Sequence, residues 1–292
     1  LAKKIYYHNN ILLNTGINDL YKYKEKLKSI GINYVYIEDK YSKDIEINYI
    51  IKDEIREQGQ RRIKKFMNDI KFNRSLNVSE IKNTVADIVD EIFNNSEDVL
   101  VNMIDIKNYD DYTFEHSVNV AVYSIILGRA LNFNVKDLKK LGVGAILHDV
   151  GKILIPQEIL LKKEKLSEEE YEIIQEHPKL GYDYIKNIEE INSASKSVIL
   201  SHHERLNGSG YPKKNTHEEI HEFAKIVAIT DVYDALTSDR IYRKRWPVHE
   251  AINYIMSNSD EQFDSNYVNK FIRNLAIYPN GSMVRLSNGK KA

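Results

Sequence analysis

The chain contains no cysteine among its 292 residues. This absence excludes a framework of disulfide bonds and also a zinc site built from thiolates. The sequence has no uninterrupted apolar run near the roughly 20 residues that span a membrane, and its N-terminal segment lacks the apolar core of a secretory signal. We therefore expect a cytoplasmic protein that does not insert into membranes.

A strong net charge is equally absent, because 42 basic and 43 acidic residues leave a formal charge of -1 at pH 7. Such a chain produces no overall field that would attract nucleic acid or acidic lipid, and we expect no binding to DNA. The hydrophobic fraction of 42% and the charged fraction of 29% are near the averages for globular proteins. The chain is long enough to enclose a substantial core.

The most informative segment covers residues 147–152, with the sequence LHDVGK. It places His148 beside Asp149 and adds Lys152, so two metal ligands and a phosphate-binding cation lie within one turn. A lone His-Asp pair is weak support for a metal site, because many such pairs only satisfy each other's hydrogen bonds in a protein core. Its meaning therefore depends on the rest of the sequence.

Seven residues in the chain are candidate metal ligands, and they lie on five segments that are otherwise apolar. They comprise five imidazoles and two carboxylates: His116, His148, Asp149, His177, His202, His203 and Asp231. A set without thiolates suits iron, manganese or zinc better than calcium or magnesium.

The local sequence around the first candidates predicts how they converge. His116 is followed by apolar residues at helical spacing, so we expect it near the start of a core-facing helix. His148 and Asp149 end the apolar run 141–147, which is typical of a closely packed, buried helix. Because adjacent helical residues point about 100° apart, each can face one of two metals, or Asp149 can bridge both.

The next candidates lie at predicted helix ends. His177 begins a helix after an acidic turn over residues 167–176. His202 and His203 close a helix over residues 193–201 and lead into a loop whose glycines permit unusual backbone angles. Two neighbouring imidazoles at a helix end can share one ion.

Asp231 lies inside the apolar stretch 224–235. A carboxylate buried there is costly unless it binds a metal or pairs with a cation. A buried salt bridge to an arginine is the alternative to a metal ligand for this residue alone.

Two stretches, HDVGK at 148–152 and HHERLNGSGYP at 202–212, resemble the two signatures of HD-GYP domains, a branch of the HD metal-dependent phosphohydrolases. The similarity extends from about residue 101 to residue 271 and includes the spacing between the motifs. It implies a mainly α fold with an HD-type helical bundle. It also implies hydrolysis of the bacterial second messenger cyclic di-GMP to linear pGpG and commonly onward to GMP.

Carried over residue by residue, the resemblance implies two metal sites that share Asp149. The first is assigned to His116, His148, Asp149 and Asp231, and the second to His177, His202 and His203. The resemblance also implies contacts with the substrate. It places Lys152 at the scissile phosphate and Tyr211 at the border of the pocket. It assigns Arg240 and Arg243 to a clamp on phosphate or guanine.

The number of metals depends on one position. A third metal in this family needs a carboxylate one helical turn before the first histidine, where this chain has Tyr112. We therefore expect two divalent transition-metal ions, while Asp110, Asp111 and Glu115 keep a third site open. Iron and manganese are favoured, with zinc and nickel as alternatives, because cellular availability often decides between ions at such ligands.

The chemistry of such a site follows from general principles. Two cations that share a water lower its pKa, yield hydroxide at neutral pH and polarise a phosphoryl oxygen. The hydroxide attacks the phosphodiester in line, and Asp149 holds both cations. Lys152 is expected to stabilise the negative charge of the transition state, and protonation of the leaving 3′ oxygen is a second candidate role for this lysine.

The pattern along the chain predicts four parts: a small α+β module over 1–50, a helical connector over 51–98, the phosphohydrolase domain over 99–276, and a truncated C-terminal strand or hairpin over 277–292. The module has strand patterns at 11–16 and 31–37 around a helix at 19–30. Amphipathic helices over 52–72 and 78–93 form the connector, with a coiled-coil dimer arm as the alternative. We expect a homodimer.

Other readings of the same residues remain open. The site can serve a different nucleotide, which the Gly-Tyr-Pro loop and the Arg240/Arg243 pair argue against. It can also be a non-catalytic cyclic dinucleotide receptor, which the intact ligand positions argue against. His217 and His221 are spaced like metal ligands, but no partner is evident in the sequence, so surface roles are expected.

Overall fold

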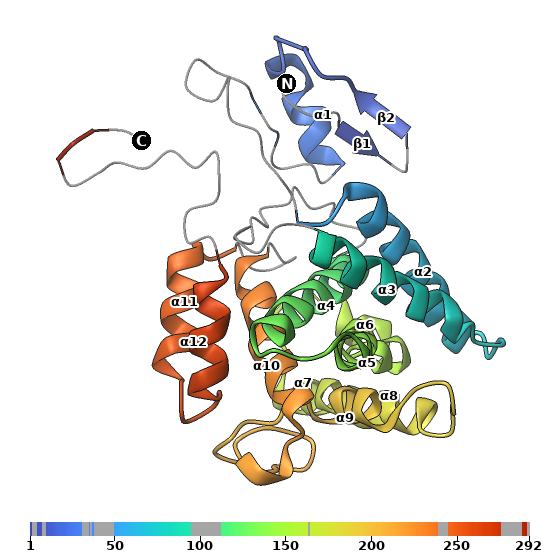
Figure 1. Cartoon of the computed structure of the whole chain (residues 1–292). Coiled ribbons are helices and arrows are strands. Elements are labelled where there is room, and N and C mark those ends of the chain that lie inside the picture. Colours follow the sequence, from blue (N-terminus) through green and yellow to red (C-terminus); the bar gives the residue numbers. More distant parts are fainter. Residues whose placement is uncertain are drawn as a thin grey trace. The chain divides into compact units, whose positions relative to one another are not determined.

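The computed structural model describes residues 1, 5–7, 10–30, 35, 37, 50–94, 112–162, 164–238, 245–275 and 288–290 (Figure 1). The chain divides into two compact units. One comprises Leu1–Tyr49, Val101–Tyr112 and Ala276–Ala292, and the other comprises Ile50–Leu100 and Thr113–Leu275. The domain boundaries predicted near residues 50, 98 and 276 stay predictions.

The first unit contains a short hairpin and a helix. Strand β1 (Ile5–Tyr7) pairs antiparallel with β2 (Asn10–Leu13), and η1 (Tyr21–Tyr23) leads into α1 (Lys24–Ser29). Leu27 of α1 packs against Ile5 and Leu13 of the hairpin. The second predicted strand, at 31–37, and the C-terminal hairpin lie almost entirely outside the described residues.

The second unit is built from helices, which confirms the mainly α fold class predicted from the sequence. Its elements in chain order are α2 (Asp53–Lys71), α3 (Val78–Asn94), α4 (Tyr112–Ala130), α5 (Val135–Ile146), η3 (Val150–Leu154), α6 (Gln157–Leu160), α7 (Glu168–Gln175), α8 (His177–Ile185), α9 (Ser193–Ser201), η4 (His217–Glu219), α10 (Glu222–Thr237), α11 (Val248–Ser257) and α12 (Ser265–Arg273).

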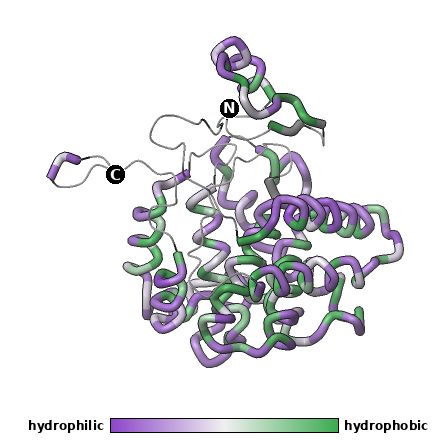
Figure 2. Tube along the Cα trace, turned by 45° about the horizontal axis from the view of Figure 1, so that its top comes forward, coloured by the Kyte–Doolittle hydropathy of each residue, from purple (hydrophilic) through white to green (hydrophobic). Residues whose placement is uncertain are grey.

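The outer helices α2 and α3 are amphipathic, as the sequence predicts. Their apolar residues recur every three or four positions and are buried, while ion pairs such as Lys65–Glu80 and Arg62–Asp87 join their polar sides. Figure 2 shows this alternation of hydrophobic and hydrophilic residues along the helices. Helix α3 also packs on α5, so the pair belongs to the helical unit.

The central helices α4 and α10 are apolar on nearly all sides, and most of their described residues are buried. A helix without a polar face is stable only inside a bundle. Three rings join α4, α10 and α12, because Tyr123, Tyr233 and Phe271 make edge-to-face contacts with ring centres 5.1 to 6.0 Å apart. This aromatic cluster helps to hold the helices together.

One element differs from the sequence prediction. Residues 167–176 were expected to form an acidic turn, but Glu168–Gln175 form the helix α7. The Ser167 side chain accepts a hydrogen bond from the Glu170 backbone N–H, and the Glu170 carboxylate accepts one from the Ser167 backbone N–H. This capping box, with three glutamates in the first turn, stabilises the N-terminus of a helix.

No helix in the described part of the chain is both long enough and apolar enough to cross a membrane. Trp246 and Pro247 directly precede α11.

Two glycines allow unusually close contacts between elements. A Cβ atom on Gly151 of η3 would lie 2.0 Å from the backbone oxygen of His177 and 2.6 Å from the backbone nitrogen of Gly181. A Cβ atom on Gly142 of α5 would instead meet the side-chain methyl group of Val85 at 2.5 Å. The neighbours of Gly151 are backbone atoms, so no side-chain rotation can make room for a Cβ atom there. At Gly142 the neighbour is a side chain, which can move.

We predict that Gly151→Ala destabilises the protein more than Gly142→Ala. Inserting a methyl group into a packed core costs roughly 1–3 kcal/mol when side chains can move, and Gly142→Ala should fall in this range. Gly151→Ala should exceed it, because α8 must separate from η3. Urea unfolding with a chelator present measures both, and equal losses would contradict the close-contact explanation.

Candidate metal centre

The seven candidate ligands converge at the centre of the helical unit. They come from α4, the turn after α5, the start of α8, the residues that follow α9, and α10. Two groups have ligand atoms that all lie within 4.8 Å of one another: His116, His148 and Asp149, and Asp149, His177, His202 and His203. Asp149 is common to both groups.

The Asp149 carboxylate faces each group with a different oxygen. Its Oδ2 lies 3.3 Å from His148 Nε2 and 3.7 Å from His116 Nε2. Its Oδ1 lies 3.2 Å from His177 Nε2 and 3.8 Å from His202 Nε2. This is the arrangement expected of a carboxylate that bridges two cations.

Asp231 completes the first group. Its Oδ1 lies 3.1 Å from His116 Nε2 and 3.9 Å from His148 Nε2, and its Oδ2 lies 3.8 Å from His203 Nδ1. Within the described residues the ion-pair partners of Asp231 are thus imidazoles, and the partly buried Arg205 acts on Asp231 through its charge without forming an ion pair with it.

Three histidine rings are oriented by the backbone of their own helical turn. The Nδ1–H groups of His148, His177 and His202 donate hydrogen bonds to carbonyl oxygens three residues earlier in the chain, at 2.7, 2.7 and 3.1 Å. Because a carbonyl oxygen only accepts, the proton of each neutral ring is on Nδ1. Each Nε2 therefore presents a lone pair to the centre.

His116 is oriented differently. Its Nδ1–H donates to Oδ2 of Asp234 at 2.7 Å, and Oδ1 of the same carboxylate accepts a hydrogen bond from Asn119 at 3.0 Å. No role was predicted for Asp234 from the sequence. A signal was available, because Asp234 is a second carboxylate in an apolar helix, three residues after Asp231 and on the same side.

The centre fits cations, as its unsatisfied atoms show. His148 Nε2 and Asp149 Oδ1 are buried without a hydrogen-bond partner in the described structure. The Nε2 atoms of His177 and His202 lie 3.3 Å apart, and neither can donate when both protons are on Nδ1. Buried polar atoms are rarely left unpaired. Bound cations would satisfy all four.

The protonation states of His202, His203 and Asp149 also suit cations. Burial lowers the pKa of His202 to about 4 and holds the pKa of His203 well below its ordinary value. Burial alone would raise the pKa of Asp149, but His148, Lys152 and His177 outweigh it and the pKa lies well below the usual range. Neutral imidazoles and an ionised carboxylate are the forms that bind metals.

His116 is the exception. Burial lowers its pKa, but the hydrogen bonds to Asp231 and Asp234 outweigh burial and leave the pKa above the ordinary value. Both carboxylates are themselves buried and close to this ring. A cation at Nε2 would take the place of the proton that they favour.

Lys152 lies at the edge of the centre. Its Nζ is 2.5 Å from Asp149 Oδ2, and its side chain keeps 23% of its surface exposed, whereas that of Asp149 keeps 2%. The ammonium group can therefore meet a ligand that enters from solvent while it stays beside the bridging carboxylate.

The Gly-Tyr-Pro loop covers one side of the second group. The ring of Tyr211 stacks on the ring of His203, with centres 4.6 Å apart and an angle of 27°. The Tyr211 backbone N–H also donates to the His203 carbonyl at 3.2 Å. A Cβ atom on Gly210 would lie 2.4 Å from that carbonyl, so this position requires glycine. Tyr211 thus borders the centre.

A buried glutamate holds this loop in place. Glu204 is 1% exposed, and its two carboxylate oxygens accept hydrogen bonds from the backbone N–H groups of Lys213 at 2.7 Å and Asn215 at 2.9 Å. Both oxygens are therefore used by the loop. Glu204 belongs to the motif at 202–212, but this role was not predicted from the sequence, because its partners are backbone groups that no side-chain pattern reveals.

Four of the predicted residues, Arg240, Arg243, Asp110 and Asp111, lie outside the described residues. Glu115 is described and is buried. Among the described residues two ligand groups form, and a third site stays a prediction.

The histidines with expected surface roles make local contacts. His217 Nε2 lies 3.6 Å from Asp264, and the His221 ring accepts a hydrogen bond from the Phe223 backbone N–H at the start of α10.

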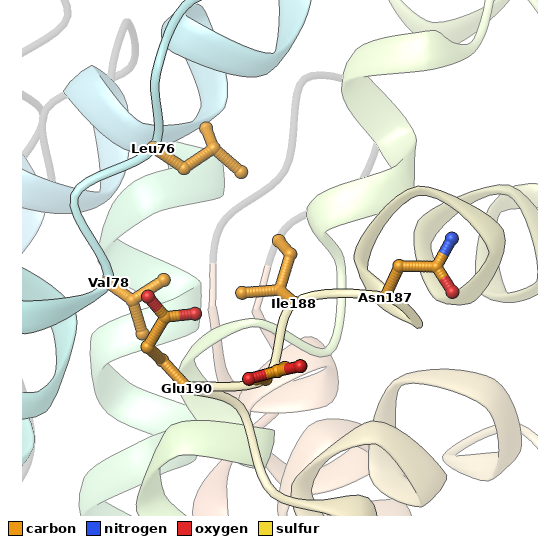
Figure 3. Close-up of a pocket in the computed structure, with 6 residues that line it drawn as sticks. Leu76, Val78, Asn187, Ile188 and Glu190 are labelled. Atoms are coloured by element: carbon orange, nitrogen blue, oxygen red, sulfur yellow. The ribbon is translucent and has the colours of Figure 1, made fainter.

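A surface hollow elsewhere in the helical unit is lined by the segment before α3, by the first residue of α3 and by the connection between α8 and α9 (Figure 3). Its lining side chains are Leu76, Val78, Asn187, Ile188, Glu189 and Glu190, and none of them is a candidate ligand.

Comparison with known proteins identifies the class. Residues 98–267 match the HD domain family, and the chain belongs to that family. The resemblance to HD-GYP proteins predicted from the sequence is confirmed. A solved structure, Bd1817, described as an HDG"Y"P protein from Bdellovibrio bacteriovorus, superimposes with a TM-score of 0.63 over 92% of each chain at 20% identity. This likeness establishes the fold.

Among characterised proteins, the chain is similar to phosphodiesterases of cyclic dinucleotides. The chain is 36% identical over 208 residues to the cyclic di-GMP phosphodiesterase PA4108 of Pseudomonas aeruginosa, which covers 70% of this chain and 50% of that protein. It is 35% identical over 152 residues to the cyclic di-GMP phosphodiesterase response regulator RpfG of Xanthomonas campestris, covering 52% and 40%. It is 35% identical over 185 residues to the 3′3′-cGAMP-specific phosphodiesterase 1 of Vibrio cholerae, covering 62% and 41%. The chain thus spans about half the length, or less, of these relatives.

We predict that Glu204→Ala releases the Gly-Tyr-Pro loop. Hydrogen bonds to a charged group contribute about 1.5–3 kcal/mol each, so amide exchange at Lys213 and Asn215 should become about 10–100-fold faster. Hydrogen exchange followed by mass spectrometry measures this. The matched control is Glu219→Ala, which removes an exposed glutamate that also accepts a hydrogen bond from a backbone N–H in this region. This control should leave the amides of Lys213 and Asn215 protected. Unchanged exchange in Glu204→Ala would refute the clamp.

Proposed function

We propose that the chain is a metal-dependent phosphodiesterase that hydrolyses cyclic di-GMP. The convergence of five imidazoles and two carboxylates, bordered by Lys152 and Tyr211, carries this proposal. The names of the relatives support the substrate class, since several are cyclic di-GMP phosphodiesterases.

Two divalent cations would be held by the two ligand groups. The first would bind to His116, His148, Asp149 and Asp231, and the second to Asp149, His177, His202 and His203. Bound there, they would supply an activated water and neutralise charge on the phosphoryl oxygens. Iron or manganese is the favoured ion, and zinc and nickel remain alternatives, because imidazole and carboxylate ligands accept several first-row metals.

The chain's own groups then position the phosphodiester. The Lys152 ammonium, held beside Asp149 and partly exposed, would bind a non-bridging oxygen and stabilise the charge that develops during the reaction. Burial raises the pKa of Tyr211, so its phenol stays protonated and can donate a hydrogen bond to the substrate instead of acting as a base. Arg240 and Arg243 are proposed to clamp phosphate or guanine.

The product is proposed to be GMP, with pGpG as the intermediate. Linear pGpG retains one phosphodiester bond of the same kind, so the groups that hydrolyse the ring can act on it again. The homodimer and the cytoplasmic location expected from the sequence stay predictions.

Three relatives are named as 3′3′-cGAMP-specific phosphodiesterases. This cyclic dinucleotide is therefore the competing substrate that an assay must include. A receptor that binds without hydrolysis is the other alternative, and it predicts binding of the cyclic dinucleotide with no product.

We predict that Asp149→Ala abolishes hydrolysis of cyclic di-GMP, because both cations lose their shared ligand. The assay incubates protein loaded anaerobically with iron or manganese and follows cyclic di-GMP, pGpG and GMP by chromatography, with 3′3′-cGAMP in parallel. Bound metal is counted in the same samples.

The matched control is Asp183→Ala, which removes an exposed aspartate that also pairs with a lysine three residues later, Lys186. This variant should keep its metal and its activity. Full activity in metal-loaded Asp149→Ala would refute the bridging role. A wild-type protein that carries metal but converts only 3′3′-cGAMP, or neither substrate, would refute the proposed substrate.

We predict that Lys152→Met lowers kcat by roughly 100-fold, the usual loss when one donor that stabilises transition-state charge is removed. The metal content should stay that of the wild type, which separates the lysine from the ligands. Lys186→Met is the control, because it removes the exposed lysine of the equivalent pair. An unchanged kcat in Lys152→Met would exclude a contact with the reacting phosphate.

A further inference from the structure

We infer that Asp234 is a positioning residue that sets the affinity of the first cation site by fixing the ring of His116. This inference rests on the proposed metal centre and goes beyond it, because Asp234 is not among the proposed ligands. It assigns a distinct task to a second carboxylate of α10.

The His116 ring lies between two carboxylates of the same helix. Its Nε2 is 3.1 Å from Asp231 Oδ1, and its Nδ1 is 2.7 Å from Asp234 Oδ2. Asp231 and Asp234 are three residues apart on α10 and so lie on one side of that helix. Asp231 can share a cation with Nε2 of the ring, while Asp234 binds Nδ1 on the opposite side of the ring.

Asn119 makes the arrangement more rigid. It lies on α4 three residues after His116 and donates a hydrogen bond to Asp234 Oδ1 at 3.0 Å. All three side chains are buried, with exposed fractions of 2% for His116 and 1% for Asn119 and Asp234. Both oxygens of Asp234 are thus bound by α4, and the ring has one orientation relative to α10.

The contrast with the other ligands shows why Asp234 matters for a cation. His148, His177 and His202 donate to neutral carbonyl oxygens of their own turn. His116 instead donates to a carboxylate from another helix, 118 residues away. A carboxylate acceptor orients the ring and raises the basicity of the ligating nitrogen, and loss of such partners typically costs 10–100-fold in metal affinity.

A purely structural tie between α4 and α10 is the competing explanation, and the chain offers a control for it. Ser124 on α4 and Thr230 on α10 also form a buried side-chain hydrogen bond, at 2.8 Å. Neither hydroxyl belongs to the ligand set. Ser124→Ala therefore removes a buried contact between the same two helices without releasing a ligand ring.

The experiment compares Asp234→Ala, Asp234→Asn and Ser124→Ala with the wild type. Each protein is stripped of metal and titrated with Mn²⁺ by equilibrium dialysis, and its melting temperature is recorded. Wild type should bind two equivalents. Asp234→Ala should bind one of them about 10–100-fold more weakly and the other as in the wild type.

Asp234→Asn separates charge from orientation. Its amide oxygen can still accept from His116, and Asn119 can turn its own amide so that Oδ1, which is buried without a partner in the described structure, accepts from the new amide. The loss of affinity should therefore be smaller than in Asp234→Ala. If Asp234→Ala does not fold, Asp234→Asn becomes the test of the inference. Weaker binding of one Mn²⁺ equivalent by Asp234→Asn would then support it.

Ser124→Ala should melt at a lower temperature yet bind both equivalents as the wild type does. Wild-type affinity for both equivalents in the Asp234 variants would overturn the inference, and so would an equal loss in Ser124→Ala. A wild type that binds no Mn²⁺ would overturn the metal centre itself, an outcome distinct from failure of the Asp234 role alone.

Discussion

The burial of two ionised carboxylates inside an apolar bundle is the constraint on which the rest of this structure depends. Asp149 and Asp231 are almost inaccessible to solvent, and unpaired charges at such positions would cost far more than the stability of a typical domain allows. Five imidazoles and one ammonium group surround them. The helices are arranged so that these partners meet.

This requirement explains where the closest contacts in the bundle occur. Gly151 and Gly181 bring η3 and α8 into backbone contact, and this contact sets Asp149 next to His177. Gly210 allows the loop after His203 to fold back onto its own backbone. Small residues thus stand beside the ligands, where a side chain would separate two elements that must touch.

The sequence predicted the parts of the site that depend on local pattern. The helix over residues 193–201 has the predicted bounds, and His202 and His203 follow it. Asp231 and His116 lie on the apolar helices expected for them. Asp234 and Glu204 were missed because their partners are distant or belong to the backbone. The prediction of a turn at α7 was wrong. Its acidic composition was the basis of that prediction, but Ser167 and Glu170 provide a capping box that begins a helix.

The way each imidazole is oriented also bears on the order in which the centre can assemble. The rings of His148 and His177 bind a carbonyl oxygen of their own turn, so they are oriented as soon as that turn forms. Formation of one turn is a fast, local event. His116 is aimed only after α10 has docked on α4, which closes a loop of more than a hundred residues. Three of the five imidazoles are thus oriented by local contacts, whereas the orientation of His116 depends on a contact 118 residues away.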